Sequence, residues 1–365
     1  MLSWNWELVE ARPLFDMLGD PRPGHGLLGV SDPDLHREGD VTSMLIGAMT
    51  RRLTVRIVQA RTPPGVGVAE DRWEFVTDAR GRAVELGAPS SRRAWDGAGM
   101  HTPCYVRGEA GGREVERIYY AGRRSLAGTG PNSRFAIGLL EKRDGAWTRR
   151  SGPVLTGDTA RPSALEPYVV WADGRWRIWF LSAIGEVGRG EQPDYELRYS
   201  ESDDGEEWEP PEVFASTEEG FFDNVVIREP DGWSMLLARG TNLHGTSPFP
   251  PQGLWVASAT GTPGGRACWS EPERLLDTDL EAEPWYAAGV CGPAIVLDDE
   301  VPSDQTGGSA PERRVHVFAT GTYPRIGWWR AAVGRLGQRR SLPPPAPFFL
   351  ATGRFTFRCT PASGG

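Results

Sequence analysis

The sequence predicts an all-β fold, a five-bladed β-propeller whose four-stranded antiparallel blades surround a central tunnel. Two recurring elements predict this fold: a polar turn followed by tryptophan, and a proline that opens an apolar strand. The composition agrees, because 46 Gly and 31 Pro among 365 residues favour many turns over long helices. Hydrophobic residues make up 39% of the chain, which is enough for a sizeable core.

The tryptophan turn occurs four times, as EDRWEF at 70–75, RDGAWTR at 143–149, DDGEEWEP at 203–210 and GRACWSEP at 265–272. Trp147, Trp208 and Trp269 follow one another at intervals of 61 residues. We expect an aromatic ring at the same place in each unit to pack between neighbouring sheets. The Asp-Gly before the ring predicts a tight turn.

The proline element opens a strand at four places, and a fifth copy lacks the proline. The copies are SDPDL at 31–35, HTPCYV at 101–106, LEPYVV at 165–170, CGPAIV at 291–296 and, without proline, FDNVVI at 222–227. A second apolar strand follows each copy, and the units are about 60 to 70 residues long. A solenoid would need shorter units, and a pair of β-sandwiches would not repeat the Pro and Trp positions.

This repeat sets the expected domain boundaries. We expect one propeller over residues 1–340, with blades starting near residues 31, 101, 165, 222 and 291. The first dozen residues alternate in polarity, which predicts a strand that closes the ring or caps one face. Residues 341–365 are expected to form a C-terminal hairpin and tail packed on the propeller.

Charge and motifs exclude several classes of function. A net charge of −9 argues against binding a nucleic-acid backbone, and no run of 18 apolar residues predicts a membrane span. The N-terminus lacks the features of a signal peptide, so a cytoplasmic protein is the default expectation. The cysteines and histidines lack metal-ligand spacing, and no glycine-rich segment has the setting of a phosphate loop. No cofactor and no metal are therefore predicted, and the expected partner is a small molecule.

The residues at the pre-proline position supply the candidate catalytic groups. If the repeat is right, they form a ring at one depth around the axis: Asp32, Thr102, Glu166, Asp223 from the copy without proline, and Gly292. Carboxyl groups that share a confined mouth raise the pKa of at least one of them, and this separation of acid from base is what glycoside cleavage requires. The alternative is that Asp-Pro and Glu-Pro are only strand-entry turns with exposed acids.

Within this ring, the local sequence suggests a role for each acid. Glu166 is the candidate acid because Leu165, Tyr168 and Trp171 around it are apolar. Asp32 is the candidate base, and Asp34 lies one pleat further along on the same face.

Aromatic and polar side chains near the inner strands are candidates for substrate contacts. The candidates are Asp34, Trp95, His101, Thr102, Tyr168, Phe222 and Trp285. The loops WDGAG at 95–99 and EPWYAAG at 283–289 enter two blades in parallel fashion, which favours a pocket wall. Packing in the core is an equally good explanation for each aromatic ring.

The segments WDGAGMHTPCYV at 95–106 and RIYYAGR at 117–123, with the Asp-Pro at 32–33 and the Asp-Gly-x-x-Trp turns, resemble the five-bladed β-propeller glycosidases. These include glycoside hydrolase families 43, 62, 32 and 68 and related phosphorylases, and the resemblance covers roughly residues 25–335. It implies an active site at one mouth of the tunnel, with Asp32 as base or nucleophile and Glu166 as general acid.

Two positions depart from the pattern of these families. Glu166 is adjacent to its proline, where one residue usually intervenes, and Pro103 has no acidic neighbour. The usual second-blade Asp is therefore missing, and Asp96, six residues before Thr102, is the candidate to replace it from a loop.

The sequence therefore supports two hypotheses. The first is a glycoside hydrolase-like enzyme that cleaves a small glycoside or sugar-bearing metabolite by acid–base catalysis. The second is a propeller without glycosidase activity, which serves as a biosynthetic enzyme of specialised metabolism or as a carbohydrate- or metabolite-binding protein.

Overall fold

A computed structural model describes residues 4–19, 22–89, 91–126, 134–184, 194–229, 232–239, 251–279, 282–297, 313–346 and 348–361. Over these ranges the chain is almost entirely β-strand, and its α-helix is α1 (Trp328–Gly337). Short 3-10 helices occur at η1 (Val68–Glu70), η3 (Arg266–Cys268) and η4 (Pro284–Tyr286). Within the described ranges no helix is long and apolar enough to cross a membrane.

Two four-stranded antiparallel sheets follow one another in the second half of the chain. One has the order β11 (Ser163–Ala172), β12 (Arg175–Ala183), β13 (Tyr195–Ser202) and β14 (Glu212–Ala215). The next has the order β15 (Phe221–Glu229), β16 (Gly232–Arg239), β17 (Gly253–Ala259) and β18 (Glu273–Asp277).

The first half of the chain forms a nine-stranded sheet with two antiparallel halves. One half contains β2 (Leu27–Glu38), β3 (Val41–Thr50), β4 (Val55–Arg61) and β5 (Glu74–Phe75). The other contains β6 (Gly99–Ala110), β7 (Arg113–Arg123) and β8 (Ala136–Arg143), with β9 (Ala146–Arg149) and β10 (Leu155–Thr156) both paired to β8. The parallel pairing of Val55 with Gly99 joins the halves, so each half has the strand plan of the four-stranded sheets.

The remaining sheet contains both ends of the chain. Its order is β1 (Trp4–Asp16), β21 (Leu350–Pro361), β20 (Arg313–Thr322) and β19 (Val290–Leu297). The expected N-terminal strand is present, and it pairs with β21 from Trp4 opposite Pro361 to Asp16 opposite Ala351. The expected C-terminal hairpin is wrong, because β21 is a single long strand inserted between β20 and β1.

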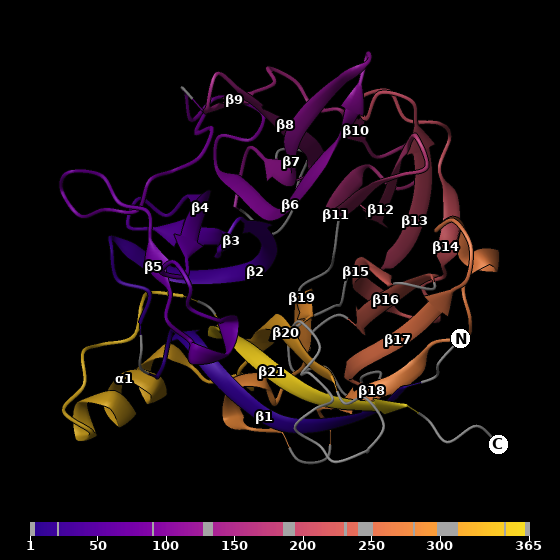
Figure 1. The fold of residues 1–365 in the computed structure, drawn as a ribbon. Coiled ribbons are helices and arrows are strands. Elements are labelled where there is room, and N and C mark those ends of the chain that lie inside the picture. Colours follow the sequence, from indigo (N-terminus) through magenta and orange to yellow (C-terminus); the bar gives the residue numbers. More distant parts are fainter. Residues whose placement is uncertain are drawn as a thin grey trace.

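The sheets lie around a common centre, with β2, β6, β11, β15 and β19 on the inside (Figure 1). Each of these inner strands contacts the next one in chain order, and β19 contacts β2, so the inner strands form a closed ring. Tight turns join the strands within sheets: Asp144-Gly145 and Asp173-Gly174 both have positive φ at the two residues, as type I′ hairpin turns require.

Three of the four recurring tryptophans pack between sheets as the sequence predicts. They make edge-to-face contacts with the second strand of the preceding sheet: Trp73 with Phe318, Trp208 with Tyr119, and Trp269 with Trp179. Trp147 instead contacts Tyr105 of its own sheet. Because these rings are placed between sheets, they fix the angle at which one sheet lies on its neighbour.

A ring of carboxyl groups on the inner strands

Four inner strands carry the same backbone irregularity directly before a proline. Asp32, Thr102, Glu166 and Gly292 have φ of 56°, 45°, 49° and 55°, values in the left-handed region. The register of β2, β6, β11 and β19 against their partner strands shifts at the same points. Such bulges redirect a side chain, and left-handed φ in residues other than glycine is uncommon and concentrated at functional sites.

The fifth inner strand, β15, has no proline, and its register shift lies between Phe221 and Asp223. The Asp223 side chain is 5% exposed, and its Oδ2 accepts a hydrogen bond of 2.8 Å from the N–H of Gly292 on β19. This bond holds the carboxyl group of Asp223 against the neighbouring inner strand.

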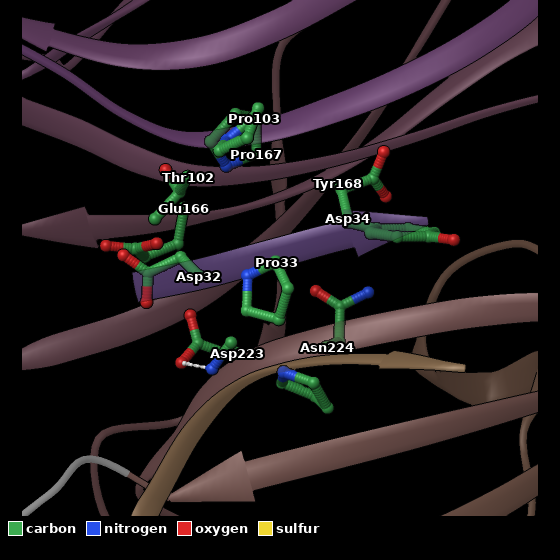
Figure 2. Close-up of a pocket in the computed structure, with 12 residues that line it drawn as sticks. Asp32, Pro33, Asp34, Thr102, Pro103, Glu166, Pro167, Tyr168, Asp223 and Asn224 are labelled. Atoms are coloured by element: carbon green, nitrogen blue, oxygen red, sulfur yellow. Dashed lines mark hydrogen bonds between the residues drawn. The ribbon is translucent and has the colours of Figure 1, made fainter. Parts of the chain in front are cut away.

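The predicted ring residues come together in the structure. Figure 2 shows Asp32, Glu166 and Asp223 with Thr102 on one side of the prolines, and Asp34, Tyr168 and Asn224 on the other side. A cavity of about 30 Å³ lies between them, lined by the pre-proline residues, the prolines and their neighbours. That volume holds about two water molecules, so the space between the prolines is too small for a sugar ring.

Asp32 has two hydroxyl groups as partners. Ser31 Oγ donates to its Oδ2 over 2.8 Å and Thr320 Oγ1 to its Oδ1 over 3.4 Å, while the backbone N–H of Asp32 donates to Thr320 Oγ1 over 2.6 Å. Burial raises the pKa of Asp32 above the usual range, and the two hydroxyl groups oppose this rise because they stabilise the ionised form.

Glu166 has different surroundings. Burial raises its pKa well above the usual range, and the negative charges of Asp223 and then Asp32 raise it further. Thr102 and the positive charge of Arg123 act in the opposite direction. Together these effects favour the protonated form of Glu166, while Asp32 accepts hydrogen bonds. Acid–base catalysis needs one protonated and one ionised carboxyl group in this way.

Asp223 of the ring and Asp34 on the far side of the prolines are also buried. Burial, with a contribution from the charge of Asp32, raises the pKa of Asp223 to about 8, and the N–H of Gly292 opposes it. Burial raises the pKa of Asp34 to about 7, opposed by the N–H of Tyr105, which donates to Asp34 Oδ2 over 2.8 Å. Asp34 therefore links β2 to β6 on the far side of the prolines.

A wall of aromatic and basic side chains stands next to Glu166. The Arg123 guanidinium lies 4.5 Å from the centre of the Phe135 ring, and the His101 ring makes an edge-to-face contact with the same phenylalanine. Tyr195 makes a similar contact with Phe222, the residue before Asp223. The predicted residues His101 and Phe222 thus lie in this wall, although they do not line the cavity between the prolines.

Four residues of this site were not predicted from the sequence: Arg123, Phe135, Tyr195 and Thr320. Arg123 ends β7 and Phe135 precedes β8, so both lie at the strand ends that flank the carboxyl groups. In an antiparallel hairpin the end of the second strand lies beside the start of the first. The positions of Arg123 and Phe135 in the repeat could therefore have predicted that both lie near the pre-proline acids.

The structure places three predicted residues elsewhere. Asp96 is fully buried, accepts a hydrogen bond of 2.7 Å from Tyr120, and forms an ion pair of 3.1 Å with Arg149. Trp95 stacks on Tyr120, and Trp285 packs on Phe355 in the core. The loop around Asp96 therefore does not deliver a carboxyl group to the ring, because Arg149 and Tyr120 hold it within its own sheet.

Tyr168 lies on the far side of the prolines, where its hydroxyl donates to the carbonyl of Val226 over 3.0 Å. In the described parts of the chain, no three His, Cys, Asp or Glu side chains are arranged to hold a metal ion. The described site gathers carboxyl groups that differ in their hydrogen-bond partners and charged neighbours.

Comparisons with known proteins bear on the fold. No family model matches the chain, and no curated protein matches its sequence. Solved structures do resemble it, among them the catalytic domain of a family 62 α-L-arabinofuranosidase from Coprinopsis cinerea, with a TM-score of 0.56, 13% identity, and 97% of each chain covered.

Two further structures extend this likeness. A thermostable family 43 glycoside hydrolase has a TM-score of 0.56 and 12% identity over 94% of this chain and 97% of its own. The α-L-arabinofuranosidase of Podospora anserina, solved with cellotriose, has a TM-score of 0.54 and 14% identity over 99% of each chain. At such identities the likeness shows the fold alone: the chain shares the fold of the β-propeller glycoside hydrolases of families 43 and 62.

Proposed function

We propose that the chain is a five-bladed β-propeller hydrolase that cleaves a glycosidic bond in a small sugar-containing substrate. The observation that carries this proposal is the gathering of Asp32, Glu166 and Asp223, from three inner strands, on one side of the prolines. The shared fold supports the proposal, because its solved relatives are glycoside hydrolases.

In this proposal Glu166 is the general acid and donates its proton to the glycosidic oxygen as the bond to the leaving group breaks. Asp32, in its ionised form, either takes a proton from the attacking water or attacks the anomeric carbon itself. Burial, helped by the charges of Asp223 and Asp32, raises the pKa of Glu166 and keeps its proton in place. The second inner strand, β6, carries Thr102 where an acid would be expected. In this proposal Asp223 on β15, held by the N–H of Gly292, supplies the third carboxyl group instead.

The rate should depend on pH in a way that follows from these groups. Asp32 must be ionised, and since its pKa is raised, the acidic limb of kcat/KM should lie above that of an ordinary aspartate. Glu166 must be protonated, and since its pKa is raised well above the usual range, activity should persist to correspondingly high pH.

The second candidate is a propeller that binds a carbohydrate or metabolite, or serves in its biosynthesis, without hydrolysis. One observation favours it: the ring position on β6 is occupied by Thr102, and Asp96 does not replace the missing acid. In that case the carboxyl groups would act as hydrogen-bond partners for sugar hydroxyl groups.

Hydrolysis of aryl arabinofuranosides, xylosides and fructosides distinguishes the two candidates. We expect wild-type turnover of at least one substrate, and losses of about 10²- to 10⁴-fold in Glu166→Gln and Asp32→Asn. Asp173→Asn is the matched control, because Asp173 is an exposed aspartate with φ of 51° in the β11–β12 turn. A folded wild type that hydrolyses none of these substrates, yet binds sugars, would favour the second candidate.

A further inference from the structure

Arg123 is a basic residue in the wall beside Glu166, and no acid in the described ranges forms an ion pair with it. Its guanidinium stacks on Phe135 at 4.5 Å, and its Nε is buried without a hydrogen-bond acceptor among the described residues. The side chain as a whole is only partly exposed. Arg123 thus holds its charge close to the proposed catalytic groups, and its Nε donor has no partner in the part of the chain that the structure describes.

Other buried arginines among the described residues differ from Arg123 in having an acid close by, although the Nε of Arg177 and Arg313 is also without a hydrogen-bond partner. Five of them have side chains no more than 11% exposed, and each has a carboxyl oxygen within 3.5 Å: Arg56, Arg117, Arg177, Arg313 and Arg354. Arg335, which is buried without an acid, donates its Nε to the carbonyl of Ser341. A buried guanidinium without a partner costs free energy, which an anion bound in the site would offset.

Backbone contacts place Arg123 above the strand that carries Glu166. Phe135, on which Arg123 stacks, accepts a hydrogen bond at its carbonyl from the N–H of Ala164, and its own N–H donates to Ser163 Oγ. These are the first residues of β11, three and two positions before Glu166. The guanidinium therefore faces the same mouth as the acid.

The charges around Arg123 also leave room for an anion. Glu166 and Tyr195 are the groups whose negative charge would favour the cation, and the surroundings of Glu166 keep it protonated. Burial, with a contribution from the positive charge of Arg123, lowers the pKa of His101 well below its usual value and keeps it neutral. In the state that is ready for catalysis, the positive charge of Arg123 is therefore not neutralised by an adjacent ionised acid.

We propose that Arg123 binds an acidic group of the substrate, so that the sugar recognised at this mouth carries a carboxylate or a phosphate. The planar guanidinium offers two parallel N–H donors, which match the two oxygens of either group. This inference rests on the proposed function only in that a sugar occupies the mouth beside Glu166.

Binding of matched sugars tests this inference without requiring turnover. Isothermal titration would compare galacturonate and galactose 6-phosphate with galactose, and glucuronate and glucose 6-phosphate with glucose. At least one acid-bearing sugar should bind at least about tenfold more tightly than its neutral parent, the range expected for charge-assisted hydrogen bonds. Whichever acid shows this advantage identifies the group as carboxylate or phosphate.

Three variants assign the effect to Arg123. Arg123→Met, which keeps the length and removes the charge, should abolish the advantage of the acid-bearing sugar. Arg123→Lys, which keeps the charge and removes the planar fork, should retain part of it. Arg124→Met is the matched control, because Arg124 is the exposed neighbour and its loss changes the net charge equally. Thermal melting without ligand confirms that each variant is folded.

The inference is overturned if acid-bearing and neutral sugars bind alike, if no acid-bearing sugar binds at about 10 mM, or if the advantage survives in Arg123→Met. Its failure differs from failure of the proposed hydrolysis. Turnover of neutral aryl glycosides in preference to aryl uronides would remove the inference and keep the hydrolase. Acid-dependent binding through Arg123 with no turnover of any glycoside would keep the inference and remove the hydrolase.

Discussion

Asp32 and Glu166 occupy the same place in the repeat, directly before a proline with left-handed φ, yet their carboxyl groups have different partners. Asp32 accepts hydrogen bonds from Ser31 and Thr320, whereas Glu166 lies within the fields of two other carboxyl groups. Burial raises the pKa of both acids, but the hydroxyl partners of Asp32 favour its ionised form, whereas the carboxyl neighbours of Glu166 favour its protonated form. The difference arises from neighbouring strands and not from the local sequence, because both acids have the same local pattern.

Asp34 should make the protein less stable as the pH rises. Its pKa is about 7 in the folded protein and about 3.9 in the unfolded chain, so the folded state holds the proton more tightly. Stability is therefore lost between about pH 4 and pH 7, and the penalty is complete above pH 7. Asp34→Asn, which can still accept the N–H of Tyr105, should raise the free energy of unfolding at pH 8 by about 1 to 4 kcal/mol.

Urea unfolding at pH 4 and pH 8 would measure this effect. The gain from Asp34→Asn should be largest at pH 8 and small at pH 4. An equal effect of the substitution at both values would show that Asp34 is not protonated in the folded protein.

At the scale of elements, the repeat specifies where the inner strands begin, and side-chain packing specifies how the sheets meet. Trp269 is 6% exposed, packs on Trp179 of the preceding sheet, and donates its indole N–H to the carbonyl of Gly264 over 3.0 Å. The Trp269 ring therefore stabilises the packing of both its own sheet and the preceding sheet.

Trp269→Ala should lower the free energy of unfolding by about 3 to 5 kcal/mol, because it leaves a cavity between the sheets. Trp329→Ala is the matched control, since Trp329 on α1 is 76% exposed, and it should change stability by less than about 0.5 kcal/mol. Chemical denaturation of both variants would measure the two effects. Similar losses in both, or none in Trp269→Ala, would contradict the role of Trp269 between sheets.

The inner strands and the grouping of Asp32, Glu166 and Asp223 could be predicted from sequence, because each depends on a local pattern that recurs. The position of Asp96 could not, because it is set by Arg149, which is 53 residues away and on another strand. Arg123 was missed for a similar reason, since its surroundings come from Phe135 and the start of β11. Helix α1 also escaped prediction, because only Ala331, Ala332 and Arg335 of its ten residues are buried and its apolar pattern is weak.

At the scale of the whole molecule, the chain joins its two ends in one sheet. β21 lies between β20 and β1, so the last described strand is held by the first one. Trp6 of β1 packs edge-to-face on Phe357, and the Arg313 guanidinium lies 4.2 Å from the ring of Trp4. The pairing of distant segments decides this arrangement, so a hairpin at the C-terminus was the wrong expectation.

Deletion of residues 1–16 should therefore destabilise the whole ring, because it exposes one edge of β21 and removes Trp4 and Trp6. We expect a fall in Tm of more than about 10 °C, measured by circular dichroism. A synthetic peptide of residues 1–16 added to the truncated protein should restore part of the loss. A truncated protein that melts within a few degrees of the full chain would contradict the closing role of β1.

The central claim, that Glu166 is the acid and Asp32 the base, is tested most directly by the dependence of kcat/KM on the leaving group. A dinitrophenyl leaving group departs without a proton, whereas an alkyl leaving group needs one. Glu166→Gln should lose about 10²- to 10⁴-fold on the alkyl glycoside and less than about tenfold on the dinitrophenyl glycoside, while Asp32→Asn should lose activity on both. Equal losses on the two substrates in Glu166→Gln, or full activity in either variant, would contradict the assignment.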